Sequence, residues 1–174
     1  SAQLPPPILD WFTRRGWTPR AHQMDMLETA QAGEHALLIA PTGGGKTLGG
    51  FLPSLVDLYE TLGQDAANPR RKHALHTLYI SPLKALSVDV ARNLVEPVDE
   101  MGLGLRIETR TGDTSASKRQ RQRAHPPDIL LTTPEQLALF CATANARSFL
   151  GDLKRIIIDE IHALAPQKRG DLLS

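Results

Sequence analysis

The sequence predicts an α/β domain built on a mostly parallel sheet with helices on both faces. Short apolar runs of strand length alternate with longer segments of helical spacing along most of the chain. The clearest of these runs, Ile156–Ile158, is uninterrupted by polar residues, as is typical of strands buried on both faces. A length of 174 residues with 41% hydrophobic residues is enough for one domain of this kind.

Two helices are expected first. A helix over about Pro5–Arg15, introduced by three prolines, turns three apolar residues toward the core, namely Ile8, Leu9 and Phe12. Thr18–Pro19 then supplies an N-cap followed by proline at the first helical position. This second helix is expected to reach Ala32 before Gly33 stops it.

The remaining elements alternate between strand and helix. Strands are expected at His35–Ala40, His76–Ser81, Leu105–Arg110, Asp128–Thr132 and Arg155–Asp159. Helices are expected at Lys46–Leu62, Leu83–Met101, Ser115–Ala124 and Pro134–Ala144. The polar segment Gly63–Lys72 is expected to be a loop.

Composition narrows the class of protein. The net charge of +1 does not indicate a basic coat, so any nucleic-acid path must be local. The single cysteine, Cys141, excludes an internal disulfide and fits a reducing cytoplasm, and its place on a helix predicts a buried, inert thiol. No apolar run approaches the roughly 18–20 residues that a membrane span requires. A cytoplasmic location is therefore expected.

A glycine loop lies between the first strand and the helix that follows it. Its residues Thr42, Gly43, Gly44 and Gly45 can present successive backbone N–H groups to a phosphate at a helix N-terminus. Lys46 would reach the β- and γ-phosphates of a nucleotide, and the hydroxyl of Thr47 would ligate Mg²⁺. The strict phosphate-loop pattern has glycine at the position of Ala40. The alternative interpretation is a glycine-rich turn that is followed by a lysine with no role in phosphate binding.

Two carboxylates follow the last apolar run. Asp159 is expected to hold Mg²⁺ through its water shell, because this ion prefers oxygen ligands. Glu160 is expected to orient and deprotonate the water that attacks the γ-phosphoryl group. His162 could sense the phosphate site and contact a neighbouring domain or a nucleic-acid strand, although a histidine near a strand end is more often structural.

These residues resemble a known motor family. The chain resembles, over nearly its whole length, the first RecA-like domain of superfamily 2 DExH helicases, and most closely the Lhr-type group that includes ligase-associated DExH helicases. Six segments in family order carry the resemblance: Arg15–Gln23, Ala40–Thr47, Ser81–Leu86, Arg110–Thr114, Thr132–Glu135 and Asp159–His162. The resemblance implies a three-layer RecA-like P-loop NTPase fold, with ATP and Mg²⁺ as cofactors.

By this resemblance, Gln23 reads adenine, together with Arg20. A carboxamide suits the task because it offers a donor and an acceptor to N6 and N7 of the base. Trp17 or Phe12 would stack on the base. Core packing is the favoured role for Phe12, whereas the role of Trp17 stays open.

Three further segments form a nucleic-acid track by resemblance. Their residues are Pro82 and Lys84, then Thr111, Gly112 and Asp113, and finally Thr133, Pro134 and Glu135. Each segment follows a strand, so all three are expected at the sheet edge that carries the ATP site. Each segment alone would be read as an N-cap or a turn. Residues at such positions contact the sugar-phosphate backbone of the nucleic acid, so little sequence preference is expected.

Other charged residues receive a structural interpretation. The basic run Lys118–Arg123 is interpreted as a solvated helix face, with direct strand binding as the alternative. His73, His76 and His125 have no metal-ligand spacing, so no metal site other than that of Mg²⁺ is expected.

The expected function is that of a motor domain. Residues 1–33 would form the N-terminal helices with the adenine-reading motif, and residues 34–174 the RecA-like domain. The full-length protein would couple ATP hydrolysis to 3′–5′ translocation on single-stranded DNA and to unwinding, with repair as the context. Because the Ser-Ala-Thr segment, the second RecA-like domain and its arginine finger are missing, the chain is expected to be truncated and nearly inactive alone.

Three alternatives stay open at this point. A DExH RNA helicase would be stimulated by RNA, and a non-hydrolysing module would clamp nucleic acid with ATP. A small-molecule P-loop kinase would need an acceptor pocket, and the segments around Gln23 and Thr133–Glu135 argue against it.

Overall fold

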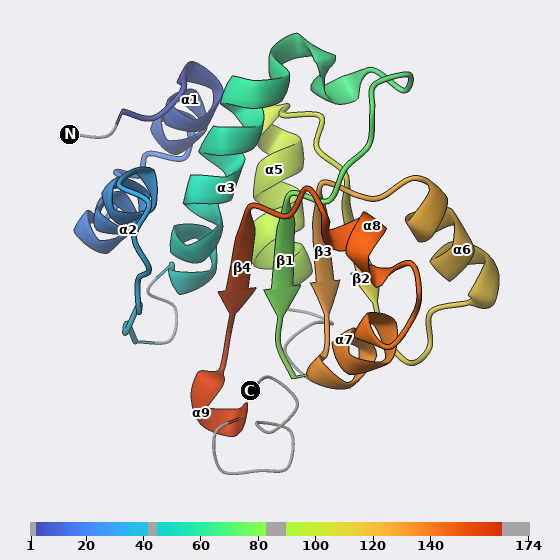
Figure 1. Ribbon diagram of the computed structural model, residues 1–174. Helices are drawn as coiled ribbons and strands as arrows, with labels where there is room; N and C mark the ends of the chain where they lie inside the picture. The colour runs from blue at the N-terminus through green and yellow to red at the C-terminus, as the bar shows by residue number, and fades with distance from the viewer. Residues whose placement is uncertain (1–2, 42–44, 83–89, 165–174) are drawn as a thin grey trace. The chain divides into compact units, whose positions relative to one another are not determined.

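The computed structural model describes residues 3–41, 45–82 and 90–164 (Figure 1). The chain divides into two compact units. One unit is Ser1–Pro69 with Val90–Leu105, and the other is Arg70–Asp89 with Arg106–Ser174. The first contains α1 (Pro6–Arg14), α2 (Ala21–Gln31), α3 (Lys46–Leu62), η1 (Gly63–Ala67), the π-helix η2 (Ala91–Val95) and α5 (Glu96–Met101). The second contains the sheet.

Helix α1 turns a different set of apolar residues toward the core than the sequence predicts. Ile8, Trp11 and Phe12 are buried, at spacings of three and four residues that place them on one helix face. The prediction for Leu9 is wrong: its position is off this stripe, and the side chain is 48% exposed. Trp11 takes its place in the core and donates from Nε1 to Oε2 of Glu100 on α5 over 2.7 Å.

Helix α2 begins later than predicted, at Ala21 and not at Thr18–Pro19. The reason is a capping interaction in which Oε1 of Gln23 accepts from the backbone N–H of Arg20 over 2.9 Å. Arg20 is therefore the N-cap. The end of the helix is as predicted, with Ala32 as C-cap and Gly33 in the left-handed region at φ 77°.

The predicted strand His35–Ala40 is wrong, because residues 34–41 have no regular secondary structure. A strand needs a partner for its backbone groups, and an apolar run does not encode whether that partner is present. Leu37 and Ile39 are 73% and 86% exposed. Of the predicted helix Leu83–Met101, residues 83–89 lie outside the described residues, and the rest divides into η2 and α5.

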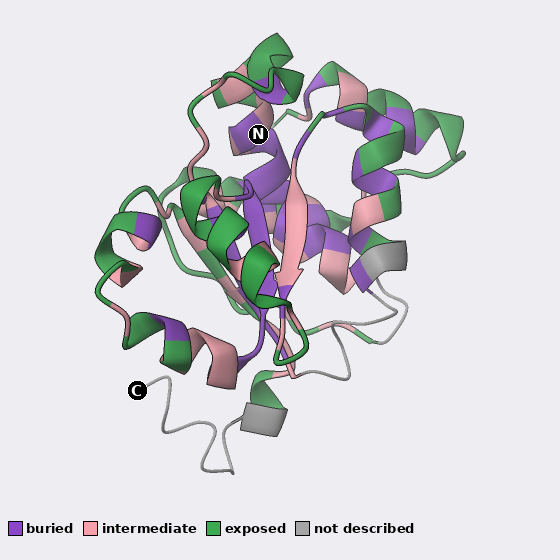
Figure 2. Ribbon diagram, turned by 90° about the vertical axis from the view of Figure 1, so that its right-hand side faces the viewer, coloured by how far each residue is buried: buried purple, intermediate pink, exposed green. Residues whose placement is uncertain are grey.

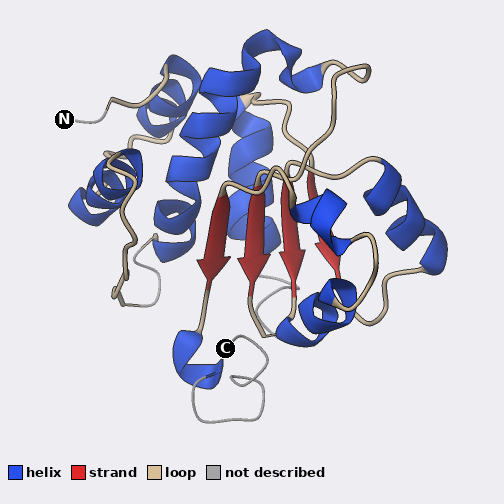
Figure 3. Cartoon of the chain, in the orientation of Figure 1, coloured by secondary structure: helices blue, strands red, loops and turns tan. Residues whose placement is uncertain are grey.

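The second unit contains a four-stranded parallel sheet in the order β2-β3-β1-β4 (Figure 3). Its strands are β1 (Thr77–Ile80), β2 (Ile107–Arg110), β3 (Ile129–Thr132) and β4 (Arg155–Ile158). Its helices are α6 (Ala116–Ala124), α7 (Pro134–Cys141), α8 (Ala146–Leu150) and α9 (Ile161–Leu164). Neither α8 nor α9 has a counterpart in the sequence prediction. The central strands β1 and β3 are buried along their whole length (Figure 2).

Helices α7 and α8 cover one face of this sheet. Phe140 and Phe149 from the two helices pack against apolar residues of the central strands, namely Leu78, Ile80 and Leu130. The aromatic rings meet edge to face with centroids 4.7 Å apart, a favourable geometry. Cys141 ends α7 and is exposed, so the prediction of a buried thiol is wrong: it lies off the core-facing side that Phe140 occupies.

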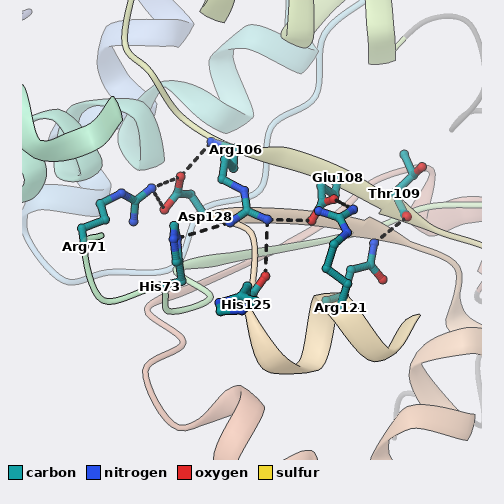
Figure 4. Close-up of polar contacts among 9 residues, drawn as sticks. Arg71, His73, Arg106, Glu108, Thr109, Arg121, His125 and Asp128 are labelled. Carbon is teal, nitrogen blue, oxygen red and sulfur yellow. Dashed lines mark hydrogen bonds and ion pairs between the residues drawn. The ribbon is translucent and has the colours of Figure 1, made fainter. Parts of the chain in front are cut away.

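The amino edge of the sheet is held by paired charges (Figure 4). Asp128, 1% exposed, accepts from Nη2 of Arg71 at 2.7 and 2.6 Å through its two oxygens. Its Oδ2 also accepts from the backbone N–H of Arg106 over 2.8 Å. The carboxylate of Glu108 pairs with both Arg121 and Arg106. These contacts join the segment before β1 to the starts of β2 and β3.

Candidate functional site

The candidate site is built on the carboxyl edge of the sheet. Because all four strands are parallel, the segments that follow them emerge at the same edge. The strand order places Thr111 at one end, then Thr133, then Ser81–Pro82, and Asp159–Glu160 at the other end. The hydroxyl of Thr132 donates to the carbonyl of Arg110 over 2.8 Å and joins the ends of β3 and β2.

Asp159 is held by a tyrosine that sequence reasoning missed. The hydroxyl of Tyr79 on β1 donates to Oδ2 of Asp159 over 2.6 Å, while Oδ1 accepts from the backbone N–H of Glu160 over 2.8 Å. Burial, and then the hydrogen bond to Asp159, raise the pKa of Tyr79 above its ordinary value. A buried tyrosine hydroxyl needs a polar partner, and that was the available signal in the apolar run of β1.

Glu160 has a left-handed backbone with φ 53°, which is unusual for a residue with a side chain. It directly follows the residue anchored by Tyr79 and precedes α9. Its Oε2 lies 3.0 Å from Nε2 of His162 in the first turn of α9. The two residues predicted as base and sensor are therefore in contact, and the side chain of His162 is 79% exposed.

Gln23 is brought to the exit of the glycine loop. Its Nε2 donates to the carbonyl of Gly45 over 3.2 Å, while its Oε1 caps α2. Gly45 has φ 72°, a backbone conformation that favours glycine, and a Cβ there would lie 2.8 Å from Nε2 of Gln23 and would force that amide to shift. Gln23 itself is 3% exposed.

The other residues predicted to bind nucleotide are placed as follows. Lys46 and Thr47 form the first turn of α3, directly after Gly45. Thr42, Gly43 and Gly44 lie outside the described residues. Trp17 is 54% exposed and packs edge to face on Trp11 with centroids 5.6 Å apart.

Phe12 is 3% exposed, which confirms its core role. Arg20 contributes its backbone N–H to the cap of α2, and the residue is exposed.

The Thr111–Thr114 turn after β2 is closed by its own threonines and by one arginine. The backbone N–H of Thr111 donates to the hydroxyl of Thr114 over 2.9 Å, and the N–H of Thr114 donates to the carbonyl of Thr111 over 3.2 Å. Arg119 on α6 donates to three carbonyls of this turn, those of Thr114, Gly112 and Thr111, at 2.8, 2.9 and 3.2 Å. Gly112 and Asp113 are exposed at its tip.

The other predicted track segments are placed only in part. Thr133 is the N-cap of α7, and its hydroxyl accepts from the backbone N–H of Gln136 over 3.4 Å. Pro134 is buried at the first helical position, and Glu135 follows in the first turn. Pro82 is half-buried after β1, and Lys84 lies outside the described residues.

The basic run Lys118–Arg123 is not a plain solvated face. Gln122 is fully buried and donates to the carbonyl of Thr109, while Arg119 is bound to the preceding turn. Charge counting alone missed these roles, because an amphipathic pattern is hard to see when the inward residues are also polar. Arg121 does reach solvent, at 50% exposure of its side chain.

The donor chemistry of this chain fits a magnesium ion. Each oxygen of Asp159 uses one acceptor site in the contacts above and keeps another, and Thr47 offers a hydroxyl. Among the described residues, His, Cys, Asp and Glu form no group of three that could hold a metal. Magnesium commonly uses one or two protein ligands, waters and substrate phosphates, so a smaller donor set suits it.

Comparison with known proteins decides the family. The model of the DEAD/DEAH box helicase family matches residues 20–174. The chain belongs to this family.

None of the helices in residues 3–41, 45–82 and 90–164 has the length and apolarity needed to cross a bilayer.

Lhr helicases are close relatives of this helicase chain. It is 44% identical to the Lhr helicase/uracil glycosylase of Escherichia coli, over 95% of this chain and 11% of the relative. It is 38% identical to the ATP-dependent helicase Lhr-Core of Methanocaldococcus jannaschii, over 98% and 21%. The chain thus spans about a tenth to a fifth of the curated relatives it matches.

A solved structure confirms the fold class. The Mycobacterium smegmatis helicase Lhr bound to ssDNA and AMP-PNP matches with a TM-score of 0.81 and 37% identity. The match covers 98% of this chain and 22% of that one. The RecA-like α/β fold and the Lhr-type resemblance predicted from the sequence are both confirmed.

Proposed function

We propose that this chain is the first motor domain of a DNA-dependent ATPase of the Lhr type. The observation that carries the proposal is the anchoring of Asp159 by Tyr79 at the sheet edge that also bears the Thr111 and Thr133 segments. Relatives named as ATP-dependent helicases, and one bound to ssDNA and AMP-PNP, support the assignment.

The nucleotide would be held by residues of α2 and α3. Gln23 uses one donor and one acceptor in its contacts with Gly45 and Arg20, so a carboxamide hydrogen and a lone pair remain for adenine. Trp17, exposed at the surface of its unit, is free to stack on a base. The N-terminus of α3 favours a phosphate, with Lys46 as its point charge.

Hydrolysis would depend on Asp159, Glu160 and Thr47. Thr47 and Asp159 would hold Mg²⁺, which neutralises charge on the phosphate oxygens when it is bound. Glu160 would take the proton of the attacking water, and His162 would orient the Glu160 carboxylate that it contacts at 3.0 Å. The raised pKa keeps the Tyr79 hydroxyl protonated as a donor to Asp159.

The single-stranded nucleic acid would lie along the carboxyl edge of the sheet, from β2 toward β1. Its backbone would contact the Thr111–Asp113 tip, the start of α7 at Thr133–Glu135, and the Pro82–Lys84 segment. Translocation with 3′–5′ polarity, unwinding and a role in repair are the finer parts of this proposal. The division into residues 1–33 and 34–174 and the cytoplasmic location also belong to it.

The test is ATP hydrolysis by the full-length protein with and without oligo(dT). We expect ssDNA to stimulate hydrolysis, and Glu160→Gln to reduce the stimulated rate by roughly 10²–10⁴-fold. Glu60→Gln is the matched control, because Glu60 is an exposed carboxylate near the far end of α3. Unchanged hydrolysis in Glu160→Gln would remove Glu160 as the base.

Two further outcomes separate the alternatives. Binding of ATP and ssDNA by the wild-type protein without hydrolysis would identify a non-hydrolysing clamp. Stronger stimulation by an RNA of matched length would identify an RNA-dependent motor.

A further inference from the structure

Trp17 is an exposed aromatic residue just after α1, and its backbone is fixed by the end of that helix. Gly16 has a left-handed backbone with φ 65°, and its N–H donates to the carbonyl of Thr13 over 3.0 Å. The N–H of Trp17 donates to the carbonyl of Phe12 over 2.9 Å, which completes a Schellman motif. A leucine would provide the apolar contact that commonly accompanies this motif. Trp17 is 54% exposed, so its indole exceeds what the helix end requires.

Two side chains hold the indole of Trp17. Its ring meets that of Trp11 edge to face, with centroids 5.6 Å apart. The guanidinium carbon of Arg15 lies 5.5 Å from the Trp17 centroid and 5.7 Å from the Trp11 centroid. A cation at this distance from an aromatic ring is attracted to it. The position of the Trp17 ring therefore depends on the position of Arg15.

Glu100 on α5 fixes Arg15 in turn. Nε of Arg15 donates to Oε2 of Glu100 over 3.2 Å, and Nη2 donates to the two carboxylate oxygens at 2.5 and 2.6 Å. The same carboxylate accepts from Nε1 of Trp11. The hydrogen bonds from Arg15, and then that from Trp11, hold the pKa of Glu100 below its ordinary value. Glu100 is therefore ionised at neutral pH and holds the guanidinium as an anion.

Stability does not account for these contacts. The side chains of Arg15 and Glu100 are 41% and 43% exposed, and an exposed ion pair contributes little to the free energy of unfolding. Helix α1 is joined to α5 independently, because Nη2 of Arg14 donates to the backbone carbonyl of Glu100 over 2.9 Å. Ordering a long side chain such as that of Arg15 also costs conformational entropy. A function that needs Trp17 in one position would explain the arrangement.

Trp17 lies within reach of the residue assigned to adenine. Three residues of chain separate it from Arg20, so the two Cα atoms are at most roughly 11 Å apart. The backbone N–H of Arg20 donates to Oε1 of Gln23. An aromatic ring can bind a base by its face, and a carboxamide can bind the same base by its edge. Trp17 and Gln23 are therefore suited to one base.

We propose that Arg15 and Glu100 are positioning residues that hold Trp17 as a stacking platform for the base of the bound nucleotide. The inference rests on the proposed function and deepens it, because it adds two residues that support the base site. Both act through the indole and not through a contact with the nucleotide. A ring that is already ordered loses less entropy when a base stacks on it, so the nucleotide binds more tightly.

The test is Arg15→Leu in the full-length protein, with Arg14→Leu as the matched control. Arg14 is the adjacent arginine and also binds Glu100, but through the backbone carbonyl. Affinities for AMP-PNP and for tripolyphosphate, which has no base, are measured by isothermal titration calorimetry. Glu100→Gln, Trp17→Ala and the double variant of Arg15→Leu with Trp17→Ala are measured in the same way. Urea unfolding is followed for every variant.

We expect Arg15→Leu to weaken AMP-PNP binding by roughly threefold to tenfold, a part of the loss that follows removal of a base stack. Tripolyphosphate should bind with the wild-type affinity, and Arg14→Leu should bind both ligands as the wild type does. Glu100→Gln should also weaken AMP-PNP binding, because a neutral carboxamide holds a guanidinium less strongly. Trp17→Ala should weaken it at least as much as Arg15→Leu, and the double variant should show no further loss.

Several results would overturn the proposal. They are an unchanged AMP-PNP affinity in Arg15→Leu, an equal loss in Arg14→Leu, and an equal loss of affinity for tripolyphosphate. A further loss in the double variant would show that Arg15 acts through another contact. If Arg15→Leu does not fold, the same comparison of the two ligands in Glu100→Gln decides.

Failure of the proposed function has a different signature. A Trp17→Ala variant with the wild-type affinity for AMP-PNP would remove the stacking platform and this inference, while nucleotide binding by the chain would stand. A wild-type protein that does not bind AMP-PNP would instead refute the proposed function.

Discussion

The two edges of the four-stranded sheet use arginine in opposite ways. At the amino edge, Arg71 is bound through two hydrogen bonds to the buried Asp128. At the carboxyl edge, Arg110 is buried to a similar degree over Phe140 with no carboxylate partner among the described residues. Paired charges of the first kind join segments of the chain, whereas an unpaired buried charge opposes folding unless a ligand completes it.

The backbone shows the same contrast. The strained Glu160 lies at the carboxyl edge, while the only other left-handed residues among the described ones are glycines. Strain of this kind persists where the surroundings enforce it, here through Tyr79 and Asp159. We therefore assign stability to the amino edge and, under the proposed function, ligand binding to the carboxyl edge of the same strands.

The largest expected effect is at the amino edge. Asp128→Ala removes the buried carboxylate that pairs with the guanidinium of Arg71 and should lower the free energy of unfolding by about 3–5 kcal/mol. Urea denaturation measures the loss. The control Asp152→Ala removes an exposed ion pair with Lys72 and should cost less than about 1 kcal/mol. Equal effects of the two variants would break the comparison.

A smaller effect is expected from Tyr79→Phe, which removes the donor to Asp159 and should cost about 1–2 kcal/mol at pH 8. The folded state raises the pKa of Tyr79, so its contribution is complete below the ordinary pKa of 10 and declines as the pH rises above it. The stability difference from Tyr79→Phe should therefore shrink between pH 10 and 11. A difference that is constant over this range would contradict the assigned hydrogen bond.

The smallest effect is expected at Glu160. Glycine adopts φ 53° without the steric penalty of a side chain, so Glu160→Gly should raise stability by about 0.5–1 kcal/mol while ATP hydrolysis is lost. Glu160→Ala is the control, since it removes the same carboxylate but keeps a Cβ. If the alanine variant is as stable as the glycine variant, the backbone at this position is not strained.

How far the sequence predicts this molecule depends on what each pattern encodes. The Ile156–Ile158 run and Lys46–Leu62 carry their own periodicity and end signals, so β4 and α3 are found where expected. The strand at His35–Ala40 depended on a neighbour that an apolar run cannot specify. The start of α2 depended on the side chain of Gln23, which was assigned to the nucleotide and also caps the helix.

The candidate site too is predictable only where the local pattern encodes the position of a residue. The position of Asp159, Thr111 and Thr133 at one edge was predictable because strand ends in a parallel sheet share an edge. Their supporting residues were not, since Tyr79 is distant in sequence from Asp159, and Arg119 reads as one charge among several. The burial of Arg110 with two nitrogens that lack a hydrogen-bond partner could not be predicted either, because only the three-dimensional arrangement shows which donors are paired.

Hydrogen exchange of the full-length protein, with and without oligo(dT) and AMP-PNP, tests the division between the edges most directly. We expect oligo(dT) to slow exchange of backbone amides in residues 111–114 and 133–136 at the carboxyl edge. Residues 70–76 and 125–128 at the amino edge should exchange at unchanged rates. Protection at the amino edge, without protection at residues 111–114, would contradict the account.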